Sequence, residues 1–160
     1  MPIISFQSKY SKNFEFLLSK LSAMIQTLKD LKNITEEYTN LCRIDQRVCT
    51  PAIQKIYSSP HYIVMSARLP GKTVFLYLGR GNNYEGLFLG EKNIPSKYRI
   101  RDRFIEFCRK YIQGAILHEI SIVKNDRLIK MSLTKRSSIC EFYMFWKGRE
   151  SYFAFYEKNE

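Results

Sequence analysis

Three consecutive segments near the C-terminus decide the fold: RFIEFCRKYIQG (103–114), ILHEISIVKNDRLIKMSL (116–133) and EFYMFWKGRESYFAFYE (141–157). The first has the three- and four-residue apolar spacing of an amphipathic helix, and the other two alternate in the manner of strands. A charged tetrapeptide interrupts each strand pair, at 124–127 (KNDR) and 147–150 (KGRE). Asn, Asp and Gly favour tight hairpin turns. The sequence therefore predicts a basic helix followed by two antiparallel hairpins.

The middle of the chain predicts further antiparallel strands. Residues 61–69 and 73–78 alternate in period two on either side of a Pro70-Gly71 turn. Residues 84–89 predict another short strand after a glycine-rich turn. Together these runs predict a meander.

The first part of the chain is less regular. Residues 12–31 place apolar side chains three and four positions apart and predict one helix. Residues 32–50 are polar and lack a clear period, so they predict a connection with at most a short helix after Thr35. Residues 52–57 fit either a strand or a helix capped by Thr50, and the strand is favoured because turn residues follow.

The predicted fold class is α+β: a barrel-like antiparallel sandwich with an N-terminal helix and one basic amphipathic helix. Residues 1–50 form the first helix and its connection, and residues 51–160 form the β-rich body of a single structural domain. The chain has 26 Lys and Arg against 15 Asp and Glu, a net charge of +11. Residues 51–160 hold 19 of the cations and 10 of the anions, a net +9. This charge favours a polyanionic partner, with a solvated basic surface as the alternative.

The basic helix is predicted to span residues 98–113 and to end at Gly114. Its apolar stripe consists of Ile100, Phe104, Phe107 and Tyr111. At 100° per residue, Arg99, Arg103 and Lys110 lie along one flank of that stripe. This flank is either a solvated face or a ridge that follows phosphates.

Motifs of several enzyme classes are missing from the sequence. There is no GxxxxGK[ST], no GxGxxG and no GxSxG. The cysteines, Cys42, Cys49, Cys108 and Cys140, form no CxxC pair, so neither a metal nor another cofactor is expected. His118 fits a structural histidine within a strand, and His61 fits an exposed turn residue. The interpretation is a protein without enzymatic activity.

The chain shows no targeting or membrane signal. Its start, MPIISFQSKY, lacks the apolar run of a signal peptide, and no stretch approaches the ~20 apolar residues of a membrane helix. A cytoplasmic protein with reduced thiols and no membrane association is expected.

Five short motifs between residues 52 and 156 follow one another in the order seen in a known family. They are AIQKIY (52–57), VFLYL (74–78), FCRKY (107–111) followed by Gly114, NDRLI (125–129) and GRES (148–151). These resemble strand, helix and turn motifs of the N-terminal domain of the NFACT family, also called the fibronectin-binding protein A N-terminal domain. The resemblance implies a fold similar to the N-terminal β-sandwich of formamidopyrimidine-type DNA glycosylases.

The resemblance also implies a function. NFACT proteins act in ribosome-associated quality control, where they bind the large ribosomal subunit and recruit aminoacyl-tRNA. A non-catalytic RNA-binding module with tRNA and the large subunit as partners is therefore expected. The expected contacts are Asp126 and Arg127 in the first turn, Gly148 and Arg149 in the second, and Arg99, Arg103, Arg109 and Lys110 of the basic helix. The family's helix-hairpin-helix and coiled coil have no counterpart here, so a fragment of a longer chain and a stand-alone relative are both open.

Two other functions are open. The family's historical label suggests an adhesin-like protein-interaction module. For such a module the aromatic edge Tyr152, Phe153, Phe155 and Tyr156 is the candidate surface. A remoter alternative is a nucleic-acid binder like the glycosylases, whose N-terminal proline would correspond to Pro2. The catalytic Glu that follows it there is Ile3 here.

Overall fold

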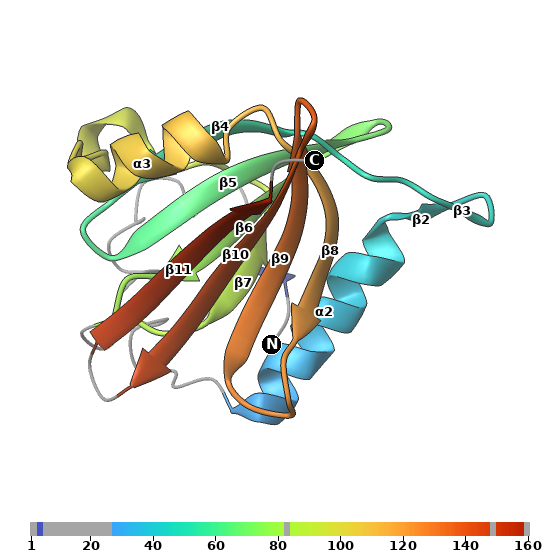
Figure 1. The fold of residues 1–160 in the computed structure, drawn as a ribbon, viewed down its shortest axis with the longest axis horizontal. Coiled ribbons are helices and arrows are strands. Elements are labelled where there is room, and N and C mark those ends of the chain that lie inside the picture. Colours follow the sequence, from blue (N-terminus) through green and yellow to red (C-terminus); the bar gives the residue numbers. More distant parts are fainter. Residues whose placement is uncertain (1–2, 5–26, 82–83, 148–149, 159–160) are drawn as a thin grey trace.

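A computed structural model describes residues 3–4, 27–81, 84–147 and 150–158, and in these residues two mainly antiparallel sheets pack together with two helices (Figure 1). The helices are α2 (Leu28–Leu41) and α3 (Arg103–Tyr111), with a 3-10 turn at Ser96–Tyr98. The strands are β1 (Ile3–Ile4), β2 (Arg43–Ile44), β3 (Arg47–Val48), β4 (Ile53–Ser58), β5 (Tyr62–Leu69), β6 (Lys72–Gly79), β7 (Leu87–Gly90), β8 (Ile116–Ile122), β9 (Leu128–Lys135), β10 (Ser138–Lys147) and β11 (Glu150–Lys158). The α+β class and the sandwich predicted from the sequence are confirmed.

The described strands of the first sheet have the order β1-β7-β6-β5-β4, and among them only the short β1 pairs in parallel. β5 alternates as predicted, with Ile63 and Met65 facing the main core between the sheets. Tyr62 and Val64 face the other way but are buried as well, in a second cluster. That cluster is completed by Tyr77, Phe88 and Ile94. This sheet is therefore covered on both faces near the start of β5.

The second sheet has the order β11-β10-β9-β8, and both of the predicted hairpins are present in it. Every second residue of β9 and β10 is buried, among them Met131, Leu133, Phe142 and Met144. The intervening residues point to the outer face, which is only partly covered. One buried and one solvated face is typical of antiparallel sheets.

Contacts between the sheets at two places make the sandwich barrel-like. Ala52, before β4, bridges to Ile116 of β8, where the Ile53 N–H donates to the Ala115 carbonyl at 2.8 Å. At the other side Gly81, after β6, bridges to Glu150 of β11. The main core lies between these two closures.

The N-terminal helix differs from the prediction. α2 begins after Thr27, whose side chain and that of Asp30 form a reciprocal capping box. It runs to Leu41, so residues 32–41 are helix and the prediction of a connection is wrong there. The buried face is Leu31, Ile34, Thr35 and Tyr38, a helical spacing that the surrounding polar residues obscure. Residues 12–26 of the predicted helix lie outside the described residues.

The basic helix begins later than predicted. Asp102 is its N-cap and accepts a hydrogen bond from the Ile105 N–H at 2.9 Å. Ile100 is extended because its N–H donates to the Ser58 carbonyl at 2.8 Å. Arg99 therefore does not lie on the helix, and the prediction of one flank shared with Arg103 and Lys110 is wrong for it. Gly114 follows the helix with φ +86°, a left-handed conformation that glycine favours.

Two smaller segments also differ. The strand predicted for 84–89 is β7, which begins only at Leu87 because Tyr84 turns back to bridge Gly81. Residues 43–48 form an unpredicted hairpin, β2–β3, in which Asp45 and Gln46 have positive φ. The strand favoured for 52–57 over a helix is confirmed as β4.

Candidate nucleic-acid interface

Tyr57 on β4 organises two of the predicted arginines. The Cζ of Arg99 lies 3.8 Å from the centroid of its ring, and the Cζ of Arg109 lies at 5.4 Å. The Nε of Arg99 donates to the Ile94 carbonyl at 2.8 Å, and that of Arg109 to the Ile56 carbonyl at 3.0 Å. Cation–π contacts contribute about 0.5–1 kcal/mol each at exposed sites. The backbone bonds and the ring together hold both guanidinium groups at this edge of the sandwich.

Arg103 and Lys110 lie on the solvent side of α3. Both are exposed, and they are seven positions apart, about two turns, which places them on the same side of the helix. Arg101 is also exposed and pairs with Glu106 at 2.6 Å. Glu106 lies 3.5 Å from Arg109 as well. These side chains continue the positive surface that begins at Tyr57.

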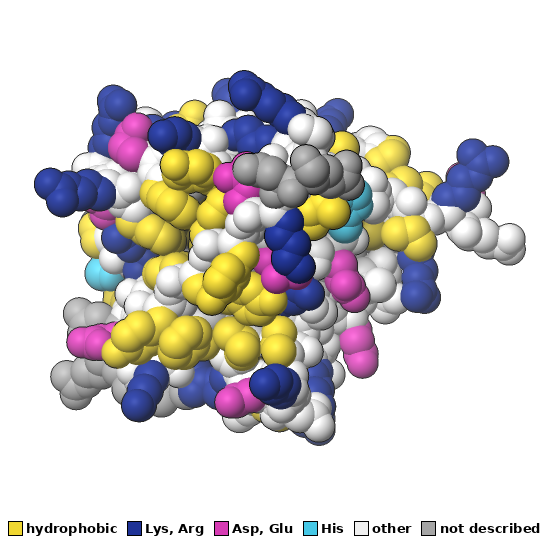
Figure 2. Space-filling model, in the orientation of Figure 1, with side chains coloured by type: hydrophobic (Ala, Val, Ile, Leu, Met, Phe, Trp, Pro, Cys, Tyr) yellow, Lys and Arg dark blue, Asp and Glu magenta, His cyan; other side chains and the backbone are white. Residues whose placement is uncertain are grey.

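We call this surface the basic end. Its cations are Lys55, Lys97, Arg99, Arg101, Arg103, Arg109 and Lys110, and its carboxylates are Asp102 and Glu106. Seven positive charges against two negative ones leave a net +5. Figure 2 shows Lys and Arg side chains along the rim of the molecule over α3 and β4. So dense a positive surface raises the local potential and attracts polyanions.

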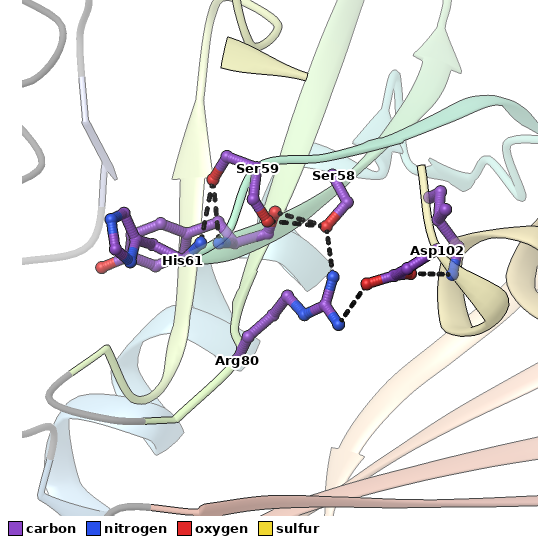
Figure 3. A network of polar contacts seen from close by, with 7 residues as sticks. Ser58, Ser59, His61, Arg80 and Asp102 are labelled. Carbon is purple, nitrogen blue, oxygen red and sulfur yellow. Dashed lines mark hydrogen bonds and ion pairs between the residues drawn. The ribbon is translucent and has the colours of Figure 1, made fainter. Parts of the chain in front are cut away.

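A polar network beneath the basic end fixes the start of α3 (Figure 3). Arg80 donates to the Ser58 hydroxyl at 2.9 Å and pairs with Asp102 at 2.7 Å. The Ser59 hydroxyl accepts from the backbone N–H of His61 at 3.2 Å. The His61 ring stacks on Tyr84 at 3.9 Å instead of bonding either serine, and burial lowers its pKa. The network therefore serves to join β4, β6 and α3.

The Asp102 carboxylate makes this junction sensitive to acid. Burial alone would raise the pKa of Asp102, but the Ile105 N–H and the Arg80 guanidinium outweigh burial, and the pKa lies below its ordinary value of 3.8. A carboxyl whose pKa is lower when folded contributes stability above its unfolded pKa and loses it as the pH falls through the folded value.

We expect the stability difference between the wild type and Asp102→Asn to be constant above about pH 4 and to shrink below it. Asparagine is a matched substitution because it also caps helices well. Urea denaturation of both proteins between pH 7 and pH 2.5 measures the difference. A difference that stays unchanged across this range would contradict the role assigned to the carboxylate charge.

Arg127 reaches back into the molecule. Its Nη2 lies 2.6 Å from Oε2 of Glu85, a side chain that is only 9% exposed. The Arg127 side chain is 30% exposed, and its buried Nε has no partner among the described residues. The ion pair joins the β8–β9 turn to the segment before β7. Arg127 is thus neutralised within the fold.

Asp126 supports its own turn. Its N–H donates to the Val123 carbonyl at 3.1 Å, and its Oδ1 accepts from the Arg127 N–H at 2.7 Å. Lys124 and Asn125 have positive φ, as a tight hairpin turn requires. The Lys32 ammonium donates to the Asn125 side chain and ties α2 to the turn. The predicted contacts Gly148 and Arg149 lie outside the described residues.

The predicted contacts fall into two separate groups. Lys110, at the basic end, accepts through its carbonyl from the Lys135 ammonium, at the end of β9. Asp126 and Arg127 precede the start of the same strand. Eight residues at about 3.3 Å each separate the two ends by roughly 25 Å. One phosphate cannot contact both groups, whereas an extended ligand can.

Several residues of the basic end were not among those predicted. Lys55 and Tyr57 lie on β4, and Lys97 and Arg101 flank Arg99 in the segment before α3. The sequence signal was the run KYRIRDR at 97–103, which holds four cations in seven residues. The helix predicted for residues 98–113 includes all of this run but Lys97, whereas α3 begins only at Arg103, so the prediction placed the exposed side of the run wrongly.

The described part of the chain also bears on metal binding, membrane spans and the glycosylase comparison. No group of three or more His, Cys, Asp or Glu side chains there could hold a metal ion. Among the described helices none is both long and apolar enough to cross a membrane. Of the glycosylase features, Ile3 pairs with Leu89 in the first sheet, and Pro2 lies outside the described residues.

The fold belongs to a class already seen in solved structures, the N-terminal domains of bacterial fibronectin-binding proteins. The N-terminal domain of fibronectin-binding protein PavA from Streptococcus pneumoniae matches with a TM-score of 0.66 and 22% identity, over 82% of this chain and 51% of that one. The N-terminal part of the fibronectin/fibrinogen-binding protein from Streptococcus suis matches with 0.58 and 25%, over 68% and 43%. The fibrinogen-binding protein from Staphylococcus aureus matches with 0.60 and 20%, over 81% and 46%.

These matches show the fold. The chain spans about half the length of the structures it matches. No protein-family model matches the sequence, and no curated protein matches it either.

Proposed function

We propose that this protein is a non-catalytic RNA-binding module and that the basic end is its RNA-contacting surface. The observation that carries the proposal is that Arg99 and Arg109 both pack on the ring of Tyr57, beside the exposed cations of α3. Arg99 uses only its Nε within the described residues, so its two Nη groups are available to a ligand. A guanidinium in this state suits a bidentate bond to a phosphate.

The arrangement on α3 supports contact with successive phosphates. Arg103 and Lys110 are two helical turns apart, which at 1.5 Å per residue is about 10 Å along the helix. Cations spaced along a ridge neutralise several phosphates and release their counterions. The resulting affinity is independent of sequence and falls steeply with salt.

The partner proposed is tRNA together with the large ribosomal subunit, in the cytoplasm, as in the NFACT family that the motifs resemble. The structural matches support the fold on which this assignment rests. As a part of such a protein, the module would act with further domains of a longer chain. The ion pair with Glu85 limits the role of Arg127, which would shape the turn beside the RNA. Asp126 would remain exposed in the same turn.

Co-sedimentation with purified large ribosomal subunits and titration of a fluorescent tRNA test the proposal. We expect binding at low salt that weakens by about 10³-fold or more between 50 and 200 mM salt if six or more phosphates are contacted. A protein that remains in the supernatant and leaves the tRNA anisotropy unchanged at low salt would contradict an RNA-binding function.

A second candidate function is binding to an extracellular-matrix protein, which the names of the structural neighbours suggest. The observation that favours it is the outer face of the second sheet. There Phe145, Tyr152 and Tyr156 are 36%, 39% and 58% exposed, and Figure 2 shows hydrophobic side chains gathered over β10 and β11. Three lysines and two glutamates around them leave a net +1, unlike the basic end. Those are Lys130, Lys147, Lys158, Glu141 and Glu150.

Surface plasmon resonance on immobilised fibronectin and fibrinogen distinguishes the two candidates. Saturable binding that Tyr152→Ala abolishes and Arg103→Ala leaves intact would favour the second function. Loss of binding with Arg103→Ala alone would indicate nonspecific attraction of a basic protein to these ligands.

A further inference from the structure

β11 carries a sequence that reads the same in both directions. Its central residues are Tyr152-Phe153-Ala154-Phe155-Tyr156, a palindrome about Ala154. The two ends of the strand have opposite charges, with Glu150 before the palindrome and Lys158 after it. When two copies of such a strand run antiparallel about an axis at the central residue, each residue of the palindrome meets a residue of the same type in the other copy. The palindrome is therefore self-complementary in a twofold arrangement.

Within the described residues, the outer edge of β11 has no paired strand over this stretch. Among the described strands, β11 pairs only with β10, so it is the edge of the second sheet. The bridge from Gly81 reaches β11 at Glu150 and leaves the palindrome beyond it without a strand on that side within the described residues. Unpaired edge strands present backbone donors and acceptors to another chain.

Both faces of this edge are aromatic. On the outer face, Tyr152 stacks on Phe145 at 5.0 Å with an interplanar angle of 12°, and Tyr156 is more than half exposed. On the inner face, Phe153 and Phe155 are only partly buried, where they contact Phe104 and Phe107 of α3. These rings leave an apolar groove between α3 and β11. A long apolar edge of this kind is an association site.

We propose that two copies of this chain associate through their β11 edges, antiparallel about a twofold axis at Ala154, so that the second sheets of both copies become one continuous sheet. In this register Tyr152 faces Tyr156 of the other copy, Phe153 faces Phe155, and Ala154 faces Ala154. Ala154 lies on the axis, and like every directly opposite pair its two copies place their Cβ atoms about 5 Å apart on the same face.

The charges at the two ends of β11 distinguish the antiparallel register from a parallel one. Gly81 occupies the edge beside Glu150, so the two strands pair over the palindrome alone, and the Lys158 side chain of the other copy extends past its end toward the Glu150 carboxylate. Opposite charges near paired strands are favourable. The parallel alternative would place like charges together. The net charge of +11 on each copy opposes association, so added salt is expected to strengthen the dimer. This salt dependence is opposite to that of RNA binding, so failure of either proposal is recognised separately.

Sedimentation equilibrium of the nuclease-treated protein at several concentrations and salt levels tests the proposal. We expect a monomer–dimer equilibrium that shifts toward dimer with salt. Ala154→Lys, which places two cations on the axis, is expected to raise the dissociation constant by about tenfold or more. The matched control is Ser132→Lys, on the outer face of β9 and away from the edge, with an unchanged dissociation constant. Circular dichroism establishes that both variants are folded.

Charge exchange tests the register itself. Glu150→Lys and Lys158→Glu are each expected to weaken the dimer, and the double exchange is expected to restore it. A protein that stays monomeric at every concentration and salt level overturns the proposal. A dimer that Ala154→Lys leaves as tight as the Ser132→Lys control overturns it as well, since association would then use another surface.

Discussion

Replacing Arg127 with alanine is expected to lower the free energy of unfolding by about 3 kcal/mol, the lower end of the range for breaking a buried ion pair. The reason lies in its partner. Glu85 is 9% exposed, and removal of the guanidinium 2.6 Å away leaves this buried side chain without an ion-pair partner among the described residues. The 30% exposure of Arg127 is why the lower end applies.

Urea denaturation followed by circular dichroism measures this effect, and two variants make it specific. Arg136→Ala removes an exposed arginine at the tip of the β9–β10 hairpin and is expected to cost less than about 0.5 kcal/mol. The double variant Arg127→Met/Glu85→Gln removes both charges and is expected to recover most of the stability. If Arg127→Ala proves as stable as Arg136→Ala, the ion pair is not the link between the sheets that the geometry indicates.

This expectation affects how RNA binding is tested at the same residue. A loss of tRNA binding by Arg127→Ala would follow from unfolding as readily as from a lost contact. Arg127→Lys keeps a positive charge opposite Glu85 and removes the planar guanidinium. It is therefore the better probe of a direct contact, provided that its stability is measured beside that of the wild type.

Gly79→Ala is expected to cost at least about 3 kcal/mol, at or above the upper end of the usual range for overpacking. A Cβ at this position would lie 2.4 Å from the Tyr84 carbonyl oxygen and 2.7 Å from its carbon. Both are backbone atoms, and the backbone of Gly79 is held on two sides. Its N–H donates to the Gly86 carbonyl at 2.9 Å, and its carbonyl accepts from Trp146 Nε1 at 3.0 Å.

A second glycine provides the control for this prediction. Gly71 has φ +77°, and a Cβ there meets no atom within 4 Å, so Gly71→Ala carries only the conformational cost of about 1–2 kcal/mol. Chemical denaturation of both variants measures the difference. Equal losses for Gly79→Ala and Gly71→Ala would show that the contact with Tyr84 relaxes without cost.

The β-rich body could be predicted because its signals are local. Period-two alternation gave β5, β6, β9 and β10, and the turn residues Asn125 and Asp126 marked the hairpin between β8 and β9. α2 was misplaced because its stripe of Leu31, Ile34 and Tyr38 is narrow and its other faces are polar. The late start of α3 depends on Ile100 pairing with Ser58, 42 residues earlier, which no local pattern contains.

In the candidate site, too, local features could be predicted from the sequence and long-range pairings could not. Arg103 and Lys110 could be placed on one side of a helix from their spacing alone, and both are exposed as expected. Arg127 was expected at a hairpin tip, but Glu85 lies 42 residues away in sequence, so their pairing required the fold. The packing of Arg99 and Arg109 on Tyr57 also required the fold, since the two arginines reach the ring from two different segments.

The salt dependence of tRNA affinity in a triple variant tests the central claim most directly. Arg99→Ala/Arg103→Ala/Lys110→Ala is expected to reduce the slope of log K against log salt by about 0.7–0.9 for each lost phosphate contact. The control, Arg43→Ala/Arg47→Ala/Lys72→Ala, removes three exposed cations elsewhere and changes the net charge equally. We predict that only the first variant loses slope and affinity. Equal losses in both variants, or none in the first, would contradict the assignment of the basic end as the RNA-contacting surface.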